Sequence, residues 1–196
     1  MRKIGILGGT FDPPHIGHLI IANEVLCALQ LDEVRFMPNH TPPHKQKTKR
    51  ISNEDRIEML KLSIQENAQF TLELADIESP GISYTFETMK RLKEKEPDAD
   101  FHFIIGADMI EYLPKWYKID ELVKLVQFVG VERPPYHTDT RYPVKLVDAP
   151  QIYLSSSYVR NKVKDGLSIK YLVVPAVEKY IEENSLYESK RSFGNS

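Results

Sequence analysis

The chain lacks most of the features that mark secreted, membrane-bound or disulfide-linked proteins. Its 196 residues include one cysteine, Cys27, which excludes an internal disulfide framework. No apolar run approaches membrane-spanning length, and the first residues lack the apolar core of a signal peptide. The formal net charge is -2, so no charge excess favours a nucleic-acid partner. These absences predict a soluble, cytoplasmic protein that binds neither membrane nor nucleic acid.

Several common chemical signatures are missing as well. The sequence has no cysteine pair and no HExxH pattern, so a zinc site would lack most of its ligands. Its glycines fit neither the GxGxxG dinucleotide fingerprint nor the GxxxxGKS/T phosphate loop. Cys27 lies in an apolar-rich run, where we expect a small packing residue and not a catalytic thiol. The sequence therefore predicts no metal held by the protein itself.

What the chain does have is an alternation of strand-like and helical patterns. Strand-like runs occupy 3–7, 34–37, 70–74, 101–105, 126–131 and 144–147, and helical patterns lie near 18–29, 53–66 and 84–95. This alternation predicts an α/β fold with a doubly wound, mainly parallel sheet and helices on both faces. Ser52 and Ser83 are the expected N-caps of two helices. Further helical patterns at 155–164 and 175–184 predict a helical C-terminal cap.

The length favours a single domain, which we place at residues 1–187 with its helical C-terminal part from about residue 155. The polar residues 188–196 are expected to fray. In doubly wound folds, ligands bind at the carboxyl edge of the sheet. Gly8 and the turn at 106–108 should therefore face one crevice.

The most informative motif follows the first predicted strand, where residues 8–18 read GGTFDPPHIGH. Two glycines let the backbone approach a bulky anion without a Cβ in the way. The chain then enters a helix whose free N–H groups and dipole favour phosphate. His15 and His18 share one face of its first turn, and each can donate to a phosphate oxygen. As metal ligands, the two histidines would lack the further ligands that a zinc site needs. A purely structural turn would leave both histidines unexplained, so a phosphate site is the favoured interpretation.

A second motif, LSSSYVR, occupies residues 154–160. Hydroxyls at a helix N-terminus cap the helix, and they can equally hold phosphate oxygens, with Arg160 one turn further along. Taken alone, the motif favours a helix cap. Beside the motif at 8–18, it favours a phosphate site.

Together these motifs resemble those of the nicotinate mononucleotide adenylyltransferases, which belong to the nucleotidylyltransferase superfamily. Residues 8–18 are similar to the GGTFDPPHxGH form of that family. Residues 154–160 are similar to its ISSTxIR motif, from which Leu154, Ser157 and Val159 depart conservatively. Residues 105–108 and 113–117 read IGAD and LPKWY, and look like the family's GAD and LPxW segments. The resemblance implies a Rossmann-like nucleotidylyltransferase fold over most of the chain.

The resemblance also implies two sets of site residues and a reaction. ATP would be bound by Gly8, Gly9, Thr10, Phe11, His15, His18, Gly106, Asp108, Arg133, Ser155, Ser156 and Arg160, of which Thr10, His15, His18 and Arg160 would act in catalysis. Nicotinate mononucleotide would be bound by Asn39, His44, Lys45, Ser83, Thr85, Trp116 and Tyr117. The expected reaction transfers the adenylyl group of ATP to nicotinate mononucleotide, giving nicotinate adenine dinucleotide and pyrophosphate. Mg2+ would arrive on the triphosphate.

Physical arguments independent of the resemblance also support two of the segments expected to bind nicotinate mononucleotide. Prolines stiffen a loop that would present His44 and Lys45 to an anion, although a solvated basic loop fits the same residues. N–H groups at the helix starts near Thr85 and Tyr117 would hold the substrate carboxylate and disfavour an amide. Trp116 offers a flat face to the pyridine ring, or takes a place in the core.

Three other functions remain as alternatives. Adenylyl transfer to phosphopantetheine would use the same ATP half-site. A nucleotide sensor would bind ATP without catalysis, but the retained histidines, serines and Arg160 argue against such a loss. An aminoacyl-tRNA synthetase would need a KMSKS-like segment and an RNA-binding domain, for which too little chain remains. The sequence leaves the oligomeric state open, with a homodimer among the options.

Overall fold

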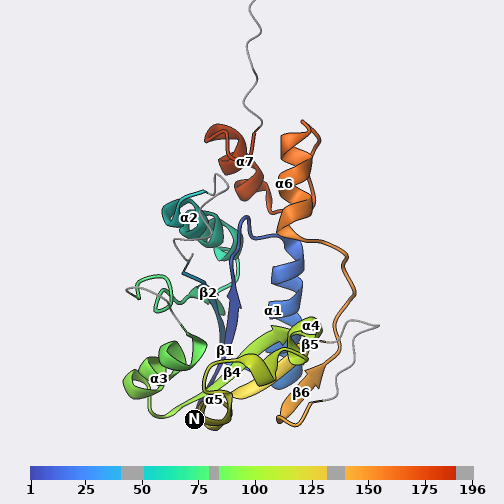
Figure 1. Cartoon of the computed structure of the whole chain (residues 1–196). Coiled ribbons are helices and arrows are strands. Elements are labelled where there is room, and N and C mark those ends of the chain that lie inside the picture. Colours follow the sequence, from blue (N-terminus) through green and yellow to red (C-terminus); the bar gives the residue numbers. More distant parts are fainter. Residues whose placement is uncertain (41–50, 80–83, 132–139, 189–196) are drawn as a thin grey trace, which may run out of the picture.

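The protein is built around a six-stranded parallel sheet, which Figure 1 shows. This computed structural model describes residues 1–40, 51–79, 84–131 and 140–188, without the side chains of 107 and 108. The strands are β1 (Arg2–Gly9), β2 (Glu33–Pro38), β3 (Phe70–Leu72), β4 (Ala99–Gly106), β5 (Gln127–Val131) and β6 (Val144–Val147). Their order across the sheet is β3-β2-β1-β4-β5-β6. The predicted doubly wound parallel sheet is therefore confirmed.

Helices cover both faces of this sheet. They are α1 (Ile16–Leu29), α2 (Asn53–Ile64), α3 (Thr85–Lys95), α4 (Ala107–Ile110), α5 (Ile119–Leu125), α6 (Ser156–Lys164) and α7 (Pro175–Glu183), with a short 3-10 turn, η2 (Leu113–Lys115). On one face, α1 and α2 bury Leu26 and Leu60 against the strands. On the other face, α3 and α5 bury Met89 and Leu122. The central strands are thus covered on both sides, which explains their continuous apolar runs.

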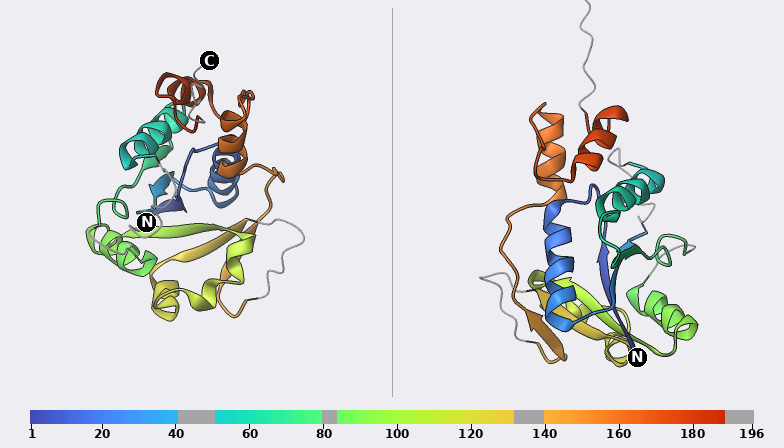
Figure 2. Two further views of the ribbon diagram at one scale, coloured as in Figure 1. Left: turned by 45° about the horizontal axis from the view of Figure 1, so that its top comes forward. Right: turned by 180° about the vertical axis from the view of Figure 1, so that it is seen from behind.

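The predicted helical C-terminal cap is formed by α6 and α7. Both helices lie beyond the carboxyl end of β1, and with α2 they enclose a small core that includes Met59, Val159 and Val177. Figure 2 shows α6 directly beyond the N-terminal end of α1, so the N-termini of these two helices meet. The Ile16 N–H donates to the Leu172 carbonyl at 2.9 Å and ties the start of α1 to the cap.

The chain reverses its direction of winding between β1 and β4, which are neighbours at the centre of the sheet. Strands β2 and β3 extend to one side of this pair, and β5 and β6 to the other. Ligands of open α/β sheets bind beyond the carboxyl ends of the strands at such a reversal. Here β1 ends at Gly9 and β4 ends at Gly106, so the two ends lie side by side as predicted.

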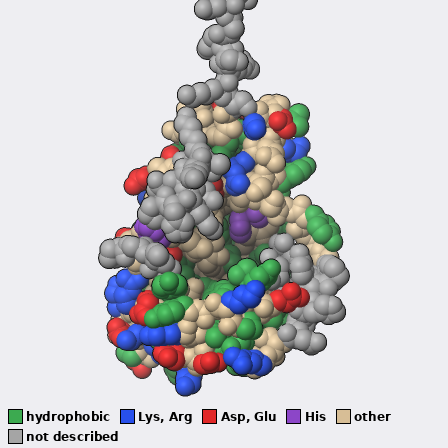
Figure 3. Space-filling view, in the orientation of Figure 1, with side chains coloured by type: hydrophobic (Ala, Val, Ile, Leu, Met, Phe, Trp, Pro, Cys, Tyr) green, Lys and Arg blue, Asp and Glu red, His purple; other side chains and the backbone are tan. Residues whose placement is uncertain are grey.

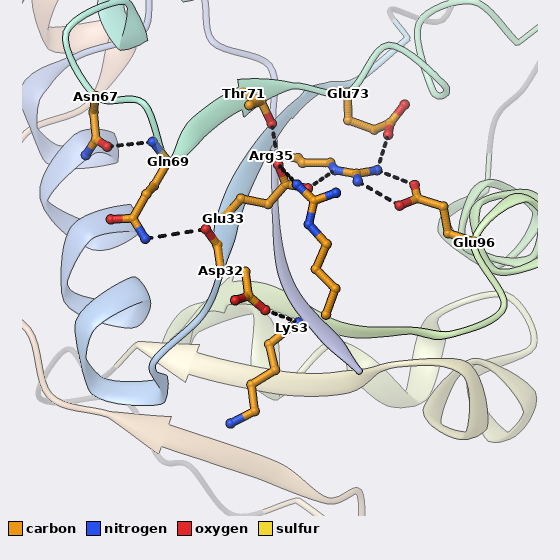
Figure 4. Close-up of polar contacts among 10 residues, drawn as sticks. Lys3, Asp32, Glu33, Arg35, Asn67, Gln69, Thr71, Glu73 and Glu96 are labelled. Atoms are coloured by element: carbon orange, nitrogen blue, oxygen red, sulfur yellow. Dashed lines mark hydrogen bonds and ion pairs between the residues drawn. The ribbon is translucent and has the colours of Figure 1, made fainter.

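A cluster of charged side chains joins β2 to the C-terminal end of α3 (Figure 4). Arg35 donates two hydrogen bonds to Glu96, from Nη1 to Oε1 at 2.5 Å and from Nη2 to Oε2 at 2.9 Å. It also donates to Glu33 and Glu73. The hydrogen bond from Arg35 lowers the pKa of Glu96, which favours the ionised form of this carboxyl.

Some local predictions need correction. Cys27 is exposed and is not the packing residue that we expected, because α1 buries positions 22, 25, 26 and 29 and turns position 27 to solvent. The N-cap of α3 is Tyr84, one residue later than predicted, and Ser83 lies outside the described residues. Ser52 caps α2 as predicted, and its Oγ accepts from the Asp55 N–H at 3.0 Å.

Candidate active site

The loop after β1 is shaped by Phe11, which has a left-handed backbone conformation with a φ of 50°. Bulky residues rarely adopt this conformation, so surrounding contacts must hold it. The buried Phe11 ring packs edge-on to His18, with centroids 4.9 Å apart, and against Phe36 at 5.9 Å. A Cβ on Gly9 would stand 3.0 Å from Phe11 Cζ. Packing within the loop therefore favours glycine at this position.

His15 and His18 stack on each other at the start of α1, with ring centroids 3.7 Å apart. His15 is the N-cap of the helix, and its backbone N–H donates to Nδ1 of His18 at 3.1 Å. Because Nδ1 accepts this bond, a neutral His18 ring carries its proton on Nε2. Nε2 is then the donor nitrogen of the neutral ring.

Three carbonyl oxygens of the loop accept hydrogen bonds from side chains of α2 and α6. Arg56 Nη1 donates to Thr10 O at 2.8 Å, Arg160 Nη1 to Asp12 O at 2.6 Å, and Ser156 Oγ to Pro13 O at 2.8 Å. These bonds fix the loop from two sides and satisfy three of its backbone carbonyl groups.

A cavity of about 410 Å³ opens beside the loop. Its lining consists of Thr10, Phe11, Asp12, His15, His18, Ile21, Leu154, Ser155, Ser156, Ser157 and Arg160. The first turns of α1 and α6 both border it, so two helix dipoles and their free N–H groups favour negative charge there. Figure 3 shows histidine side chains within the hollow at the centre of this face. The lining suits a phosphate-bearing ligand.

The three serines of the second motif have different contacts. Ser155 is the N-cap of α6, and its Oγ accepts from the Tyr158 N–H at 3.2 Å. Ser156 Oγ donates to the Pro13 carbonyl in the loop after β1, and Ser157 Oγ accepts from Arg160 Nη2 at 3.0 Å. The helix-cap interpretation is thus right for Ser155, and the same residue still borders the cavity.

Asp12 is the carboxylate among the residues that line the cavity. Its Oδ1 accepts from the Tyr187 hydroxyl at 2.7 Å, and its Oδ2 lies 3.9 Å from Nη1 of Arg160. A negative charge beside an anion site repels the ligand unless nearby donors offset it. The Tyr187 hydroxyl is such a donor, and the positive charge of Arg160 lies nearby.

The end of β1 separates this cavity from a second region. Successive residues of a strand face opposite sides of the sheet, so Gly8 and Gly9 open in opposite directions. A Cβ on Gly8 would stand 3.4 Å from Phe103 Cζ and 3.7 Å from Asn39 Oδ1, whereas Gly9 faces Phe11. The Asn39 N–H donates to the Gly9 carbonyl at 2.8 Å. The side chain of Asn39 therefore faces the side of β1 opposite to this cavity. Asn39 is one of the residues expected to bind nicotinate mononucleotide.

Trp116 and Tyr117 extend this second region. The half-buried Trp116 ring packs edge-on to Phe103 and Phe128, with centroid distances of 5.9 and 5.8 Å. Part of the ring therefore belongs to the core, as one interpretation of the sequence held. Tyr117 is exposed and packs against the exposed Tyr84, with ring centroids 4.5 Å apart.

Asp76 connects two of the segments that were expected to bind nicotinate mononucleotide. Its Oδ2 accepts from the His40 N–H at 2.9 Å, and its Oδ1 accepts from Thr88 Oγ1 at 3.0 Å. His40 follows Asn39, and Thr88 lies in the first turn of α3 after Thr85. One buried carboxylate thus fixes the chain after β2 relative to the start of α3.

The structure brings together many of the residues that were predicted to bind ATP. Those that border the cavity are Thr10, Phe11, His15, His18, Ser155, Ser156 and Arg160. Gly8, Gly9 and Gly106 lie at the adjacent strand ends but do not line it, and neither do Asn39, Thr85, Trp116 and Tyr117. The predictions for Arg133, His44, Lys45, Ser83 and the Asp108 side chain lie outside the described residues.

Arg56, Asp76 and Tyr187 support the site but were not predicted. Arg56 is 2% exposed and lies on the buried stripe of α2 with Met59 and Leu60. An arginine at an apolar position of an amphipathic helix is a signal that the sequence does contain. Asp76 and Tyr187 have no comparable signal, because their partners lie far away in the chain.

Comparisons with known proteins agree with this geometry. Residues 6–162 match the model of the cytidylyltransferase-like family. With the parallel sheet and the anion site at its reversal point, this match defines the class of the protein as a nucleotidyltransferase.

Curated relatives narrow the class further. The nicotinate-nucleotide adenylyltransferase of Bacillus subtilis (strain 168) is 55% identical over 189 residues, which cover 96% of this chain and 100% of that protein. A probable nicotinate-nucleotide adenylyltransferase of Lactiplantibacillus plantarum is 56% identical over 187 residues, 95% of this chain and 89% of that protein. The chain belongs to the nicotinate-nucleotide adenylyltransferase family.

Solved structures with low sequence identity share the fold. The nicotinic acid mononucleotide adenylyltransferase of Plasmodium falciparum, complexed with NaAD, has a TM-score of 0.79 at 23% identity and covers 95% of this chain and 98% of its own. The same enzyme complexed with APC has a TM-score of 0.78. The Rossmann-like nucleotidylyltransferase fold implied by the motifs is therefore confirmed.

Two further observations on the described residues concern metal sites and membranes. In that part of the chain, no three His, Cys, Asp or Glu side chains gather into a group that could hold a metal ion. None of its helices combines the length and apolarity needed to cross a bilayer.

Proposed function

We propose that the chain transfers the adenylyl group of ATP to nicotinate mononucleotide, with nicotinate adenine dinucleotide and pyrophosphate as products. The observation that carries this proposal is the cavity beyond β1, where two helix N-termini, two histidines and Arg160 meet. Relatives at 55% and 56% identity carry the name of this activity, which supports the choice of acceptor.

We assign the triphosphate of ATP to the cavity. Thr10, His15, His18 and Arg160 contact its phosphates, and Phe11, Ser155 and Ser156 complete the lining. Gly8 and Gly9 let the chain approach closely. Gly106, Asp108 and Arg133 are assigned to the nucleotide by the motif resemblance, and they lie at or after the ends of β4 and β5.

We place nicotinate mononucleotide on the other side of β1. Asn39, His44 and Lys45 bind its phosphate, and Ser83, Thr85, Trp116 and Tyr117 bind the nicotinate ring and its carboxylate. The position of Asn39 beside Gly8 supports this arrangement. The two substrates then meet over the end of β1.

The reaction needs no protein nucleophile. The 5′-phosphate of nicotinate mononucleotide attacks the α-phosphorus of ATP in line, and the bond to the leaving pyrophosphate breaks. The protein holds the two anions in this geometry and offsets the charge that moves onto pyrophosphate. The Nε2–H of His18 and the guanidinium of Arg160 are the donors for that charge.

The donor set fits Mg2+ that arrives on ATP. Mg2+ keeps several waters and binds phosphate oxygens readily, and the one carboxylate in the cavity lining already accepts from Tyr187. When bound, the ion would neutralise phosphate charge. Thr10, His15 and Arg160 would bind the phosphate oxygens that Mg2+ does not bind.

We further propose a cytoplasmic location, which cell fractionation would test. A homodimer remains an option for the oligomeric state, which light scattering would test.

Pyrophosphate release with ATP and a panel of acceptors tests the proposal. We expect release with nicotinate mononucleotide, with formation of the dinucleotide by mass spectrometry, and much slower release with nicotinamide mononucleotide. Release with phosphopantetheine alone would assign the chain another adenylyl transfer. Saturable ATP binding without release would make it a nucleotide sensor.

A further inference from the structure

The chain after α7 turns back and places Tyr187 against Asp12 in the loop after β1, 175 residues away in the sequence. Ser185 and Tyr187 have left-handed backbone conformations, with φ of 49° and 64°. Residues with a Cβ avoid this region, so tertiary contacts must hold the turn. The hydrogen bond from the Tyr187 hydroxyl to Oδ1 of Asp12, at 2.7 Å, is such a contact.

Asp12 and Arg160 lie close together without a direct side-chain hydrogen bond. Oδ2 of Asp12 is 3.9 Å from Nη1 of Arg160. That Nη1 donates instead to the Asp12 carbonyl at 2.6 Å, and Nη2 donates to Ser157 Oγ at 3.0 Å. The Asp12 side chain is 8% exposed, and opposite charges in such a site attract more strongly than in water. The Tyr187 hydroxyl donates to Oδ1, the other oxygen of this carboxylate.

We infer that Tyr187 is a positioning residue for ATP: its hydroxyl holds the Asp12 carboxylate and leaves the Arg160 guanidinium directed at the phosphate cavity. Without this donor, Oδ1 of Asp12 loses its hydrogen bond where little water can replace it. The carboxylate then draws Arg160 into a direct pair, and the phosphates lose a cation. The inference rests on the proposed ATP chemistry of this cavity.

The Tyr187 hydroxyl keeps its proton under all working conditions. Burial raises the pKa of Tyr187 far above its usual range, and the negative charge of Asp12 raises it further. The hydroxyl therefore remains a donor at every physiological pH. Loss of the tyrosine proton therefore does not break the contact.

Tyr180 offers a matched control within the same C-terminal segment. Its hydroxyl donates to Oδ1 of Asp55 at 2.9 Å, and Asp55 belongs to the first turn of α2. Changing either tyrosine to phenylalanine removes one hydrogen bond to a carboxylate and keeps the ring. Of these two carboxylates, that of Asp12 borders the phosphate cavity.

The test is calorimetric titration of the full chain with an α,β-methylene analogue of ATP in the absence of acceptor. We expect Tyr187→Phe to weaken binding about tenfold and Tyr180→Phe to weaken it less than about twofold. Both variants should lose similar amounts of thermal stability. Unchanged affinity in Tyr187→Phe overturns the inference, and so does an equal loss in both variants.

A double-mutant cycle tests whether Tyr187 acts through Asp12. In an Asp12→Asn background the neutral amide attracts Arg160 weakly, so adding Tyr187→Phe should cost less than about twofold in affinity. A persisting loss of about tenfold contradicts the inference. If the wild-type chain binds the analogue and Tyr187→Phe binds it equally tightly, the inference falls and the proposed function stands. If the wild-type chain does not bind the analogue, both fall.

Discussion

At the scale of single residues, the two glycines that end β1 have different tasks. Both were expected to let the backbone approach an anion. Gly9 also makes room for the Phe11 ring, while Gly8 opens toward Phe103 and Asn39 on the other face. One position supports the loop, and the other lies where the two substrates are proposed to meet.

Alanine substitutions at these glycines should therefore have different effects. Gly8→Ala adds a methyl at ordinary contact distance from Phe103 and Asn39, so stability should hold while turnover falls at least about tenfold. Gly9→Ala places a methyl 3.0 Å from the Phe11 ring, which must shift, and should cost about 1–3 kcal/mol of stability. Thermal melting and initial rates check both changes. Equal melting temperatures for the two variants would contradict this division of tasks.

His18 allows its donor and cap functions to be separated. His18→Ala removes Nε2 and Nδ1, whereas His18→Asn keeps an oxygen that can accept the N–H of His15 in place of Nδ1. Both variants should lose about a hundredfold in turnover, because both lack the Nε2 donor. His18→Ala should lose about 1 kcal/mol more of unfolding free energy. Full turnover in His18→Asn would refute the assigned role.

At the scale of elements, buried carboxylates fix the loops around the site relative to one another. Asp76 joins the chain after β2 to α3 through His40 and Thr88. These two segments carry residues proposed to bind nicotinate mononucleotide, whereas the residues proposed to bind ATP lie mainly at the starts of α1 and α6. A change at Asp76 or Thr88 should therefore act on one substrate.

Thr88→Val tests this coupling, because valine keeps the shape of threonine and removes the hydroxyl that donates to Asp76. We expect the KM for nicotinate mononucleotide to rise about fivefold and the KM for ATP to stay unchanged. Thr71→Val is a suitable control, since its hydroxyl contacts Glu33 at 3.4 Å in the sheet. Equal increases in both KM values would show that Thr88 supports only the fold.

The contact between Arg35 and Glu96 predicts a pH-dependent stability. Its hydrogen bond lowers the pKa of Glu96 in the folded protein. The contribution is therefore complete above the ordinary glutamate pKa of about 4.3 and is lost as the pH falls below it, through the lowered pKa of the folded protein. Glu96→Gln should lower the unfolding free energy by about 1 kcal/mol at neutral pH and by less in acid.

Glu94→Gln is the control for this experiment, because its side chain is 65% exposed on the same helix. Denaturant unfolding at two pH values gives the comparison. An equal loss of stability for Glu96→Gln at both pH values would show that ionisation of Glu96 does not matter.

At the scale of the whole molecule, the sheet and the two motifs that border the cavity were predictable from sequence because their signals are local. Apolar runs mark the buried strands, and the glycines, histidines and serines lie within short segments. Tyr187 and Asp76 were not predictable, since each acts through a partner brought near only by folding. Cys27 was misplaced because a run of apolar residues does not show which side of the helix faces the core.

In the proposed complex, the two substrates lie on opposite sides of the end of β1. A crystal structure with an α,β-methylene analogue of ATP and nicotinate mononucleotide bound together tests this directly. We predict the triphosphate in the cavity beside His18 and Arg160, and the acceptor phosphate on the Asn39 side of Gly8, with an oxygen about 3–3.5 Å from the α-phosphorus. Both ligands on one side of β1, or an acceptor phosphate far from the α-phosphorus, would contradict the account.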